Sequence, residues 1–168
     1  MSSLIKKYSK TFELLYLYDE NNIPKSKGND TIQKLNFHQV LNEIEELKHY
    51  LISKNQASEL FGMQKDESFE GILEHIFQTF DGIELLSSTE EKAANLLYYI
   101  VKDHPFVDGN KRIGTYIFVS FLDKNNLLKE NINFATLTSL TLLIAKSHPN
   151  EKELMINLIM SLLDKTEV

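Results

Sequence analysis

Residues 93–122 read AANLLYYIVKDHPFVDGNKRIGTYIFVSFL, and this stretch decides the fold. Its two ends, 93–101 and 113–122, are apolar on nearly every helical side. Helices without a polar face are usually the buried ones. We therefore expect these segments to form the central helix pair, with the polar loop 103–110 clamped between them. A loop held in this way is positioned rigidly, as a reaction centre requires.

The segments around this pair predict a helical scaffold. Apolar residues recur at steps of three and four over 37–53, which is typical of an amphipathic helix. Ser88 and Glu91 have the spacing of a capping box that starts the helix running through residue 93. Residues 21–34 (NNIPKSKGNDTIQK) contain proline, glycine and many polar residues, which indicates a loop. Further helices are expected at 8–19, 68–75, 134–146 and 149–163.

One β-hairpin is expected in an otherwise helical chain. Residues 76–80 (IFQTF) and 83–86 (IELL) are β-prone and flank Asp81-Gly82, a strong hairpin signal. Two strands alone are marginal in water, so the hairpin must lean on the helices. Its outer edge is free to pair with an extended peptide. The predicted fold class is all-α with one short β-hairpin.

The bulk composition bounds the function. A chain of 168 residues with 42% hydrophobic and 25% charged residues is typical of one soluble globular domain. It has no cysteine, so disulfides and thiolate metal sites are excluded, which suits the cytoplasm. No apolar run approaches the length of about 18 residues that a membrane span needs. The net charge of −6 argues against direct binding of nucleic acid.

Residues 104–112 (HPFVDGNKR) place several kinds of functional group in nine positions. Asn110 is a preferred N-cap, so the backbone N–H groups from about 109 to 112 should point out of a helix N-terminus, which attracts anions. Gly109 lets a phosphate approach the backbone closely. Lys111 and Arg112 add two cations, and arginine can hold phosphate oxygens bidentately.

His104 and Asp108 add the chemistry of a reaction centre to this anion site. Asp108 is a hard oxygen ligand suited to Mg²⁺ that bridges substrate phosphates. Histidine is the side chain best suited to proton transfer near neutral pH, so His104 can take a proton from an attacking hydroxyl. Phe106 is expected to anchor the loop in the core. Each feature alone has an ordinary structural explanation, but their coincidence between two buried helices predicts phosphoryl or nucleotidyl transfer.

These nine residues resemble the Fic/Doc (Fido) signature, His-x-Phe-x-Asp/Glu-Gly-Asn-Gly-Arg-x-x-Arg. The resemblance spans most of the chain. The wider chain is also similar to the Fic portion of RhuM-type virulence-associated proteins. It implies a Fic-type helical bundle, with a single Fic/Doc domain over 1–168 and an N-terminal helical extension over about 1–35. The other matching segments are 8–12 (YSKTF), 57–62 (ASELFG), 69–73 (FEGIL) and 147–152 (SHPNEK).

The resemblance implies transfer of part of a nucleotide, most often AMP from ATP, to a Ser, Thr or Tyr hydroxyl of a target protein. His104 is then the general base, Asp108 the Mg²⁺ ligand, and Arg112 a catalytic phosphate contact. Gly109 and Asn110 form the anion hole. The hairpin acts as a flap that docks the target by strand addition, and its residues are Gln78, Thr79, Phe80, Asp81 and Gly82.

Two positions depart from the family pattern and leave the reaction open. Lys111 stands where the consensus has glycine, as in Doc-type members, which resemble protein kinases and transfer the terminal phosphate. Thr115 replaces the second arginine, which removes a grip on the outer phosphates. Both AMP transfer and phosphate transfer therefore remain candidates. A third candidate is a catalytically idle domain that binds a nucleotide or a partner.

The resemblance raises the question of regulation by an inhibitory helix, and the sequence argues against it, because Leu14 and Lys152 stand where the pattern needs Gly or Asn and Thr115 replaces the partner arginine. That helix has the pattern Ser/Thr-x-x-x-Glu-Gly/Asn, and both Ser9 with Glu13 and Ser147 with Glu151 match only its first half. For Ser147 the sequence favours an N-cap of the last helix. A role as the toxin of a toxin–antitoxin pair would imply an antitoxin as partner. The expected location is the cytoplasm of the producing cell, with delivery into another cell as the alternative.

Overall fold

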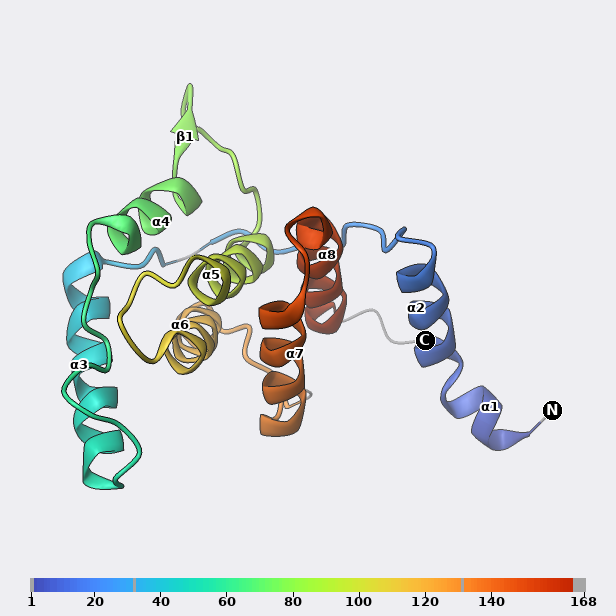
Figure 1. The fold of residues 1–168 in the computed structure, drawn as a ribbon. Helices are drawn as coiled ribbons and strands as arrows, with labels where there is room; N and C mark the ends of the chain where they lie inside the picture. Colours follow the sequence, from blue (N-terminus) through green and yellow to red (C-terminus); the bar gives the residue numbers. More distant parts are fainter. Residues whose placement is uncertain (1, 32, 131, 165–168) are drawn as a thin grey trace.

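The structure is a computed structural model that describes residues 2–31, 33–130 and 132–164. It is mainly helical, with one two-stranded antiparallel sheet (Figure 1), which confirms the predicted fold class. In chain order the elements are α1 (Ser3–Lys7), α2 (Ser9–Asp19), α3 (Phe37–Ser53), α4 (Ser68–Ile76), β1 (Thr79–Phe80), β2 (Ile83–Glu84), α5 (Thr89–Asp103), α6 (Asn110–Lys124), α7 (Phe134–Lys146), the 3-10 turn η1 (Pro149–Glu151) and α8 (Lys152–Leu163).

Helices α5 and α6 form the centre of the fold, as the sequence predicts. Helix α5 packs against α6 and also contacts α4, α7 and α8. Gly114 allows the close approach of α5 and α6, because a Cβ there would lie 3.3 Å from side-chain atoms of both Ile100 and Val101. Each large apolar side chain buried in such a core contributes about 1.5–3 kcal/mol. The fully buried side chains of the pair include Leu96, Leu97, Ile100, Ile113, Ile117, Phe118 and Phe121.

The predicted helices are confirmed with small shifts. The predicted helix 8–19 is α2, which begins at Ser9, and a short helix that was not predicted, α1, precedes it. The last segment begins with η1, and only then continues as α8. Helices α1 and α2 stand on the side of the molecule opposite to α3 (Figure 1). Within the described residues, no helix combines the length and apolar character that crossing a membrane requires.

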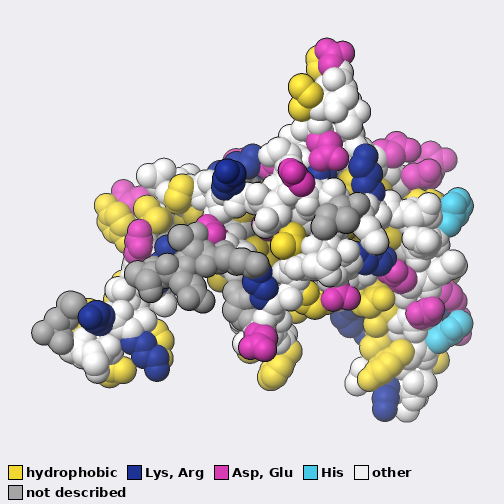
Figure 2. All heavy atoms as spheres, turned by 180° about the vertical axis from the view of Figure 1, so that it is seen from behind, with side chains coloured by type: hydrophobic (Ala, Val, Ile, Leu, Met, Phe, Trp, Pro, Cys, Tyr) yellow, Lys and Arg dark blue, Asp and Glu magenta, His cyan; other side chains and the backbone are white. Residues whose placement is uncertain are grey.

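The β-hairpin is present but shorter than predicted. Thr79 pairs with Glu84 and Phe80 with Ile83 around a turn in which Asp81 (φ 52°) and Gly82 (φ 77°) both have positive φ, as a type I′ turn requires. Residue 76 completes α4 instead of starting the strand. We call residues 78–86 the flap. It projects from the body, and hydrophobic and acidic side chains gather at its tip (Figures 1 and 2).

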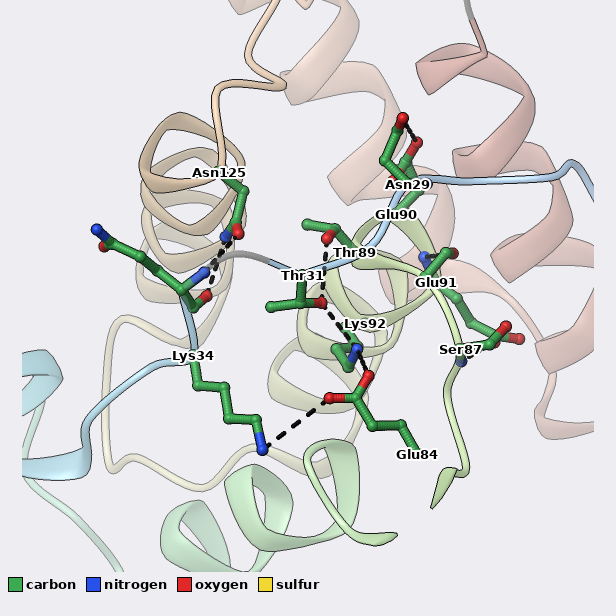
Figure 3. Close-up of polar contacts among 12 residues, drawn as sticks. Asn29, Thr31, Lys34, Glu84, Ser87, Thr89, Glu90, Glu91, Lys92 and Asn125 are labelled. Atoms are coloured by element: carbon green, nitrogen blue, oxygen red, sulfur yellow. Dashed lines mark hydrogen bonds and ion pairs between the residues drawn. The ribbon is translucent and has the colours of Figure 1, made fainter. Parts of the chain in front are cut away.

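The described residues of the predicted loop, 21–31 and 33–34, lack regular secondary structure, as predicted, but they are not a loose loop. We call residues 23–35 the strap, because this extended segment crosses the N-terminus of α5 (Figure 3). The Asn29 backbone N–H and side-chain amide both donate to the Glu90 carboxylate, at 3.0 and 2.7 Å. The Thr89 N–H in turn donates to the Asn29 carbonyl oxygen at 2.7 Å. The strap is therefore bound to the central helix through its backbone.

The N-terminus of α5 is capped largely as expected. The Ser88 hydroxyl accepts from the Glu91 N–H at 3.0 Å. The reciprocal bond of a capping box is displaced by one residue, because the Glu91 carboxylate accepts from the N–H of Ser87 at 3.2 Å. Glu91 also forms an ion pair with Lys25 of the strap. The predicted cap residue is thus confirmed, and its glutamate serves the strap as well.

We predict that Asn125→Ala loosens the strap. The Asn125 side chain accepts from the Gln33 N–H at 2.9 Å and donates to the carbonyl oxygens of Gln33 and Phe121. Loss of these buried bonds should lower the free energy of unfolding by about 1–3 kcal/mol. Denaturant unfolding measures this, and the exposed neighbour Asn126, whose φ of 59° suits glycine, supplies the control Asn126→Gly. Equal stability of the two variants would contradict the prediction.

Candidate active site

The loop between α5 and α6 is paired with a segment distant in the sequence. Residues 61–65 run beside it like a short strand. The Val107 N–H donates to the Met63 carbonyl oxygen at 2.7 Å. The N–H groups of Lys65 and Gly62 donate to the carbonyl oxygens of Pro105 and Asp108, both at 3.0 Å. Three backbone bonds therefore fix the loop from outside, and the sequence contains no local signal for this pairing.

Asn110 fixes the same loop from inside. Its side-chain oxygen accepts from the Phe106 N–H at 2.9 Å, and its side-chain amide donates to the Phe106 carbonyl oxygen at 2.8 Å. The prediction that Asn110 is the N-cap is therefore wrong: Asn110 is the first residue of α6, and Gly109 is the cap. The side chain turns back because both bonds of its amide are satisfied within the loop. Phe106 is wholly buried and packs on Phe69, with ring centroids 4.9 Å apart.

Position 109 requires glycine because of its backbone conformation and because of the neighbouring ring of Phe61. Its φ is +90°, and a Cβ there would lie 2.4 Å from the ring of Phe61. The Arg112 guanidinium covers the same ring, with Cζ 4.9 Å from the centroid. Gly109 caps α6 without a side-chain hydrogen bond. The first-turn N–H groups of α6, which have no acceptor within the helix, are therefore left to bind an anion.

His104, Asp108 and the first turn of α6 share one cavity of about 290 Å³, which residues 107 and 109–112 also line. His104 adopts a left-handed conformation (φ 50°) at the end of α5. Its Nδ1 lies 3.1 Å from the Lys102 carbonyl oxygen, which can only accept. The tautomer that fits this contact has the proton on Nδ1, and it would place the lone pair of the ring on Nε2. The Asp108 side chain is about half exposed, at 48%.

The donor set suits a Mg²⁺ ion that arrives with its substrate. Among the described residues, no three His, Asp or Glu side chains gather in a way that could hold a metal ion. Mg²⁺ is commonly held by one or two carboxylates, with phosphate oxygens and water as its other ligands. The half-exposed carboxylate of Asp108, beside the N-terminus of α6, fits this pattern.

The two cations at the site differ in how they are held. The Arg112 Nη1 donates to the Gln56 carbonyl oxygen at 2.6 Å, and Nη2 lies 3.9 Å from Asp108 Oδ2. Only part of the guanidinium is therefore available to a phosphate. Lys111 is exposed. Gln56 and Phe61, which position Arg112, were not identified from the sequence, because their contacts with α6 are distant along the chain.

A larger apolar cavity of about 470 Å³ lies beside the site. Lys111 and Arg112 line both cavities. Thr115, in the position of the second family arginine, donates to the Lys111 carbonyl oxygen at 2.8 Å and lies 3.0 Å from the Thr141 hydroxyl. Burial raises the pKa of Tyr116, and Glu43 and Glu46 raise it further, so its phenol stays protonated. The remaining lining residues are Leu47, Leu51, Val119, Phe134, Leu137, Thr138 and Leu142.

The predicted flap and the two segments that match half of the inhibitory pattern do not line the small cavity. None of residues 78–86 lines it. Ser9 and Glu13 belong to α2, which stands apart from the loop between α5 and α6 (Figure 1). The N-cap prediction for Ser147 is wrong, because its hydroxyl donates to the Ile144 carbonyl oxygen and the residue ends α7. His148 takes the cap position instead, and its N–H donates to the Glu151 carboxylate at 2.7 Å.

We predict that Gly109→Ala destabilises the protein by about 2–5 kcal/mol, since it adds a left-handed alanine and a clash with Phe61. Gly71→Ala is the matched control, because Gly71 lies in α4 and a Cβ added there would meet nothing within 4 Å beyond its own helix backbone. Helix propensity should make that variant more stable by up to about 1 kcal/mol. Urea unfolding of both variants decides the matter. A Gly109→Ala protein as stable as wild type would contradict this geometry.

A comparison with protein families supports what the geometry indicates. The model of the Fic/DOC family matches residues 29–122, from the strap through the flap and the signature loop to the end of the apolar part of α6. The match does not single out the RhuM-type proteins. No curated protein and no solved structure matches the chain. The matched segment is more than half of the chain and contains the whole cavity at His104, so the protein belongs to the Fic/Doc family.

Proposed function

We propose that this protein is an enzyme that transfers AMP from ATP to a Ser, Thr or Tyr hydroxyl of another protein. Nucleotide-dependent modification is the general activity that the Fic/Doc family suggests, and its members are commonly transferases. The observation that carries the proposal is the single cavity shared by His104, Asp108 and the first turn of α6, which has no side-chain cap. A base, a metal ligand and an anion site then meet in one small space.

The proposed step follows from these groups. The unprotonated Nε2 of His104 takes the proton of the target hydroxyl, whose oxygen attacks the α-phosphorus of ATP. The new oxygen–phosphorus bond forms as the bond between that phosphorus and the oxygen bridging to the β-phosphate breaks. Pyrophosphate leaves with the electron pair. The first-turn N–H groups of α6 stabilise the negative charge on the oxygens of the transferred phosphoryl group.

The remaining groups hold the nucleotide. Mg²⁺ held by Asp108 would neutralise charge on the leaving phosphates. Lys111 and Arg112 border both cavities, so they are suited to the phosphates of a nucleotide that spans the two. The apolar cavity then takes the nucleoside. This use of both cavities accounts for the two cations at the start of α6, which oppose the helix dipole unless an anion is bound.

Transfer of the terminal phosphate is the second candidate, and a specific observation favours it. Thr115 uses its hydroxyl within the protein, so it does not replace the grip of an arginine. Lys111, where the family has glycine, brings an extra charge to the mouth of the apolar cavity. A nucleotide bound in the opposite direction would present its γ-phosphorus to the attacking hydroxyl. The bond between the γ-phosphorus and the oxygen that bridges to the β-phosphate would then break, and ADP would leave with the electron pair.

Target recognition is proposed to use the flap. Thr79, Phe80 and Ile83 are exposed, and the short ladder leaves an edge for an extended segment of the target. The backbone of the target would supply most of the contacts, so the flap would tolerate different target sequences. A cytoplasmic role, in the recipient cell if the protein is delivered, fits a reaction that consumes ATP.

We predict that purified protein with Mg²⁺ transfers label from ATP labelled at the α-phosphate to protein in a cell lysate. His104→Ala should reduce this transfer by about 10²–10⁴-fold, which is the usual contribution of a general base. The control is His49→Ala. His49 is exposed on α3, and within the described residues its ring forms one ion pair, with the Glu45 carboxylate one helical turn earlier.

A parallel reaction with ATP labelled at the γ-phosphate separates the two chemistries. Label that enters protein only from the γ position, and depends on His104, would replace AMP transfer by phosphate transfer. Label from neither position in the wild-type protein, with retained binding of Mg²⁺–ATP, would support a domain that binds nucleotide without turnover.

A further inference from the structure

The flap is tied to the core by a buried charge. Lys92 of α5 is wholly buried, with 0% of its side chain exposed. Its Nζ lies 2.5 Å from Glu84 Oε2 in strand β2 and donates to the Thr31 hydroxyl of the strap at 2.8 Å (Figure 3). One ammonium group therefore joins the central helix, the flap and the strap. We call Lys92, Glu84 and Thr31 the latch.

Stability alone is a weak reason for this arrangement. A buried ammonium loses several kcal/mol of hydration, and its partner carboxylate only roughly repays that loss. A well-packed apolar side chain at position 92 would serve the core equally well or better. The ion pair can instead fix an orientation, because a buried ammonium group must keep its partner carboxylate beside it. In this structure that carboxylate belongs to the flap.

At the base of the flap, the Gln78 side chain donates to the His75 carbonyl oxygen at 2.8 Å, and Leu86 packs against the core. The projecting tip, in contrast, is exposed. The side chains of Phe80 and Ile83 are each 71% exposed, so they do not pack on the body. Glu84 lies within the ladder opposite Thr79, so fixing Glu84 fixes both strands. Lys34 of the strap lies 4.0 Å from the second carboxylate oxygen of Glu84 and supports the same position.

We propose that Lys92 is a positioning residue that acts through Glu84 to set the direction of the flap relative to His104. This inference rests on the proposed function, in which the flap docks the target. Lys92 lies in the first turn of α5 and His104 directly follows its last residue, so the two are twelve residues and about 18 Å apart along the helix. A rigid helix thus relates the edge that holds the target to the base that activates it.

The test uses the double variant Lys92→Met with Glu84→Gln in the full chain. Glu84→Gln leaves the buried ammonium of Lys92 without its carboxylate and should lower Tm by about 10 °C. Lys92→Met should lower Tm less, because Glu84 is 29% exposed and keeps Lys34 nearby. The double variant leaves no unpaired charge in the core, because Lys34, which loses Glu84, is largely exposed, and Thr31 keeps its 3.0 Å bond to the Thr89 hydroxyl. Its Tm should therefore return close to that of wild type. The matched control is Lys124→Met with Glu43→Gln, which removes a pair at 2.6 Å between α6 and α3.

Hydrogen exchange gives the first readout and requires no activity. In the double variant, amides of residues 79–86 should exchange faster than in wild type, while those of α5 and α6 keep their protection. The control double variant should leave the flap unchanged. Unchanged protection of the flap in the Lys92–Glu84 double variant overturns the proposal, whatever the wild-type protein does with ATP.

Transfer of label to lysate proteins gives the second readout. In the double variant the label should fall about 10- to 100-fold, which is typical of a misplaced substrate, while the Kd for Mg²⁺–ATP stays the same. A loosened flap with wild-type labelling would show that Lys92 has only a structural role and would overturn the proposal. Absence of label in the wild-type protein would refute the proposed function instead, and hydrogen exchange would still decide whether Lys92 fixes the flap.

Discussion

The pair of hydrogen bonds between the Asn110 side chain and the Phe106 backbone is the interaction on which the site depends. A buried backbone N–H and carbonyl are both satisfied by one amide, at 2.9 and 2.8 Å. A buried polar group left without such a partner would cost about 1–3 kcal/mol. The bonds close the loop into a tight ring, which holds Phe106 in the core. His104 and the start of α6 consequently face one cavity.

The pairing of the loop with residues 61–65 completes this constraint. It places Phe61 beneath Gly109, so that only glycine fits, and it brings Gln56 within reach of Arg112. Gly109 caps the helix without a side chain, which leaves the first-turn N–H groups for a ligand. The same packing that makes glycine necessary thus leaves these N–H groups available to the anion that we propose. Stability and function are served by the same contacts at this point.

A second set of constraints lies at the other end of α5. Glu90, Glu91 and Lys92 would ordinarily be exposed in a first helical turn, yet all are buried here. Glu90 binds Asn29, Glu91 pairs with Lys25, and Lys92 pairs with Glu84. The strap and the flap thus join the core through the charges of one helix. The family match begins at Asn29, the strap residue that binds this turn.

The sequence predicts what local patterns determine. The central helices follow from their apolar composition, the hairpin turn from Asp81-Gly82, and the loop at 104–112 from its cluster of functional groups. Predictions failed where one local hydrogen-bond pattern competes with another, as at Asn110 with Phe106 and at Ser147 with Ile144. Asn110 is a preferred N-cap, but the Phe106 backbone binds its amide more fully.

Other features could not be predicted because they have no local signal. Gln56, Phe61 and Met63 gain their roles only when residues 56–65 reach the loop between α5 and α6. The burial of Lys92 is likewise invisible in a sequence that reads Thr-Glu-Glu-Lys, since those residues usually form a solvated helix start.

Titration of ¹⁵N-labelled protein with Mg²⁺–ATP, followed by backbone amide chemical shifts, tests the central claim most directly. The claim is that nucleotide phosphates bind the uncapped N-terminus of α6. We expect saturable shifts that are largest at the amides of residues 109–112, with smaller shifts along the apolar cavity at Thr115 and Thr141. Saturable shifts confined to another part of the molecule, with the amides of 109–112 unchanged, would contradict the account.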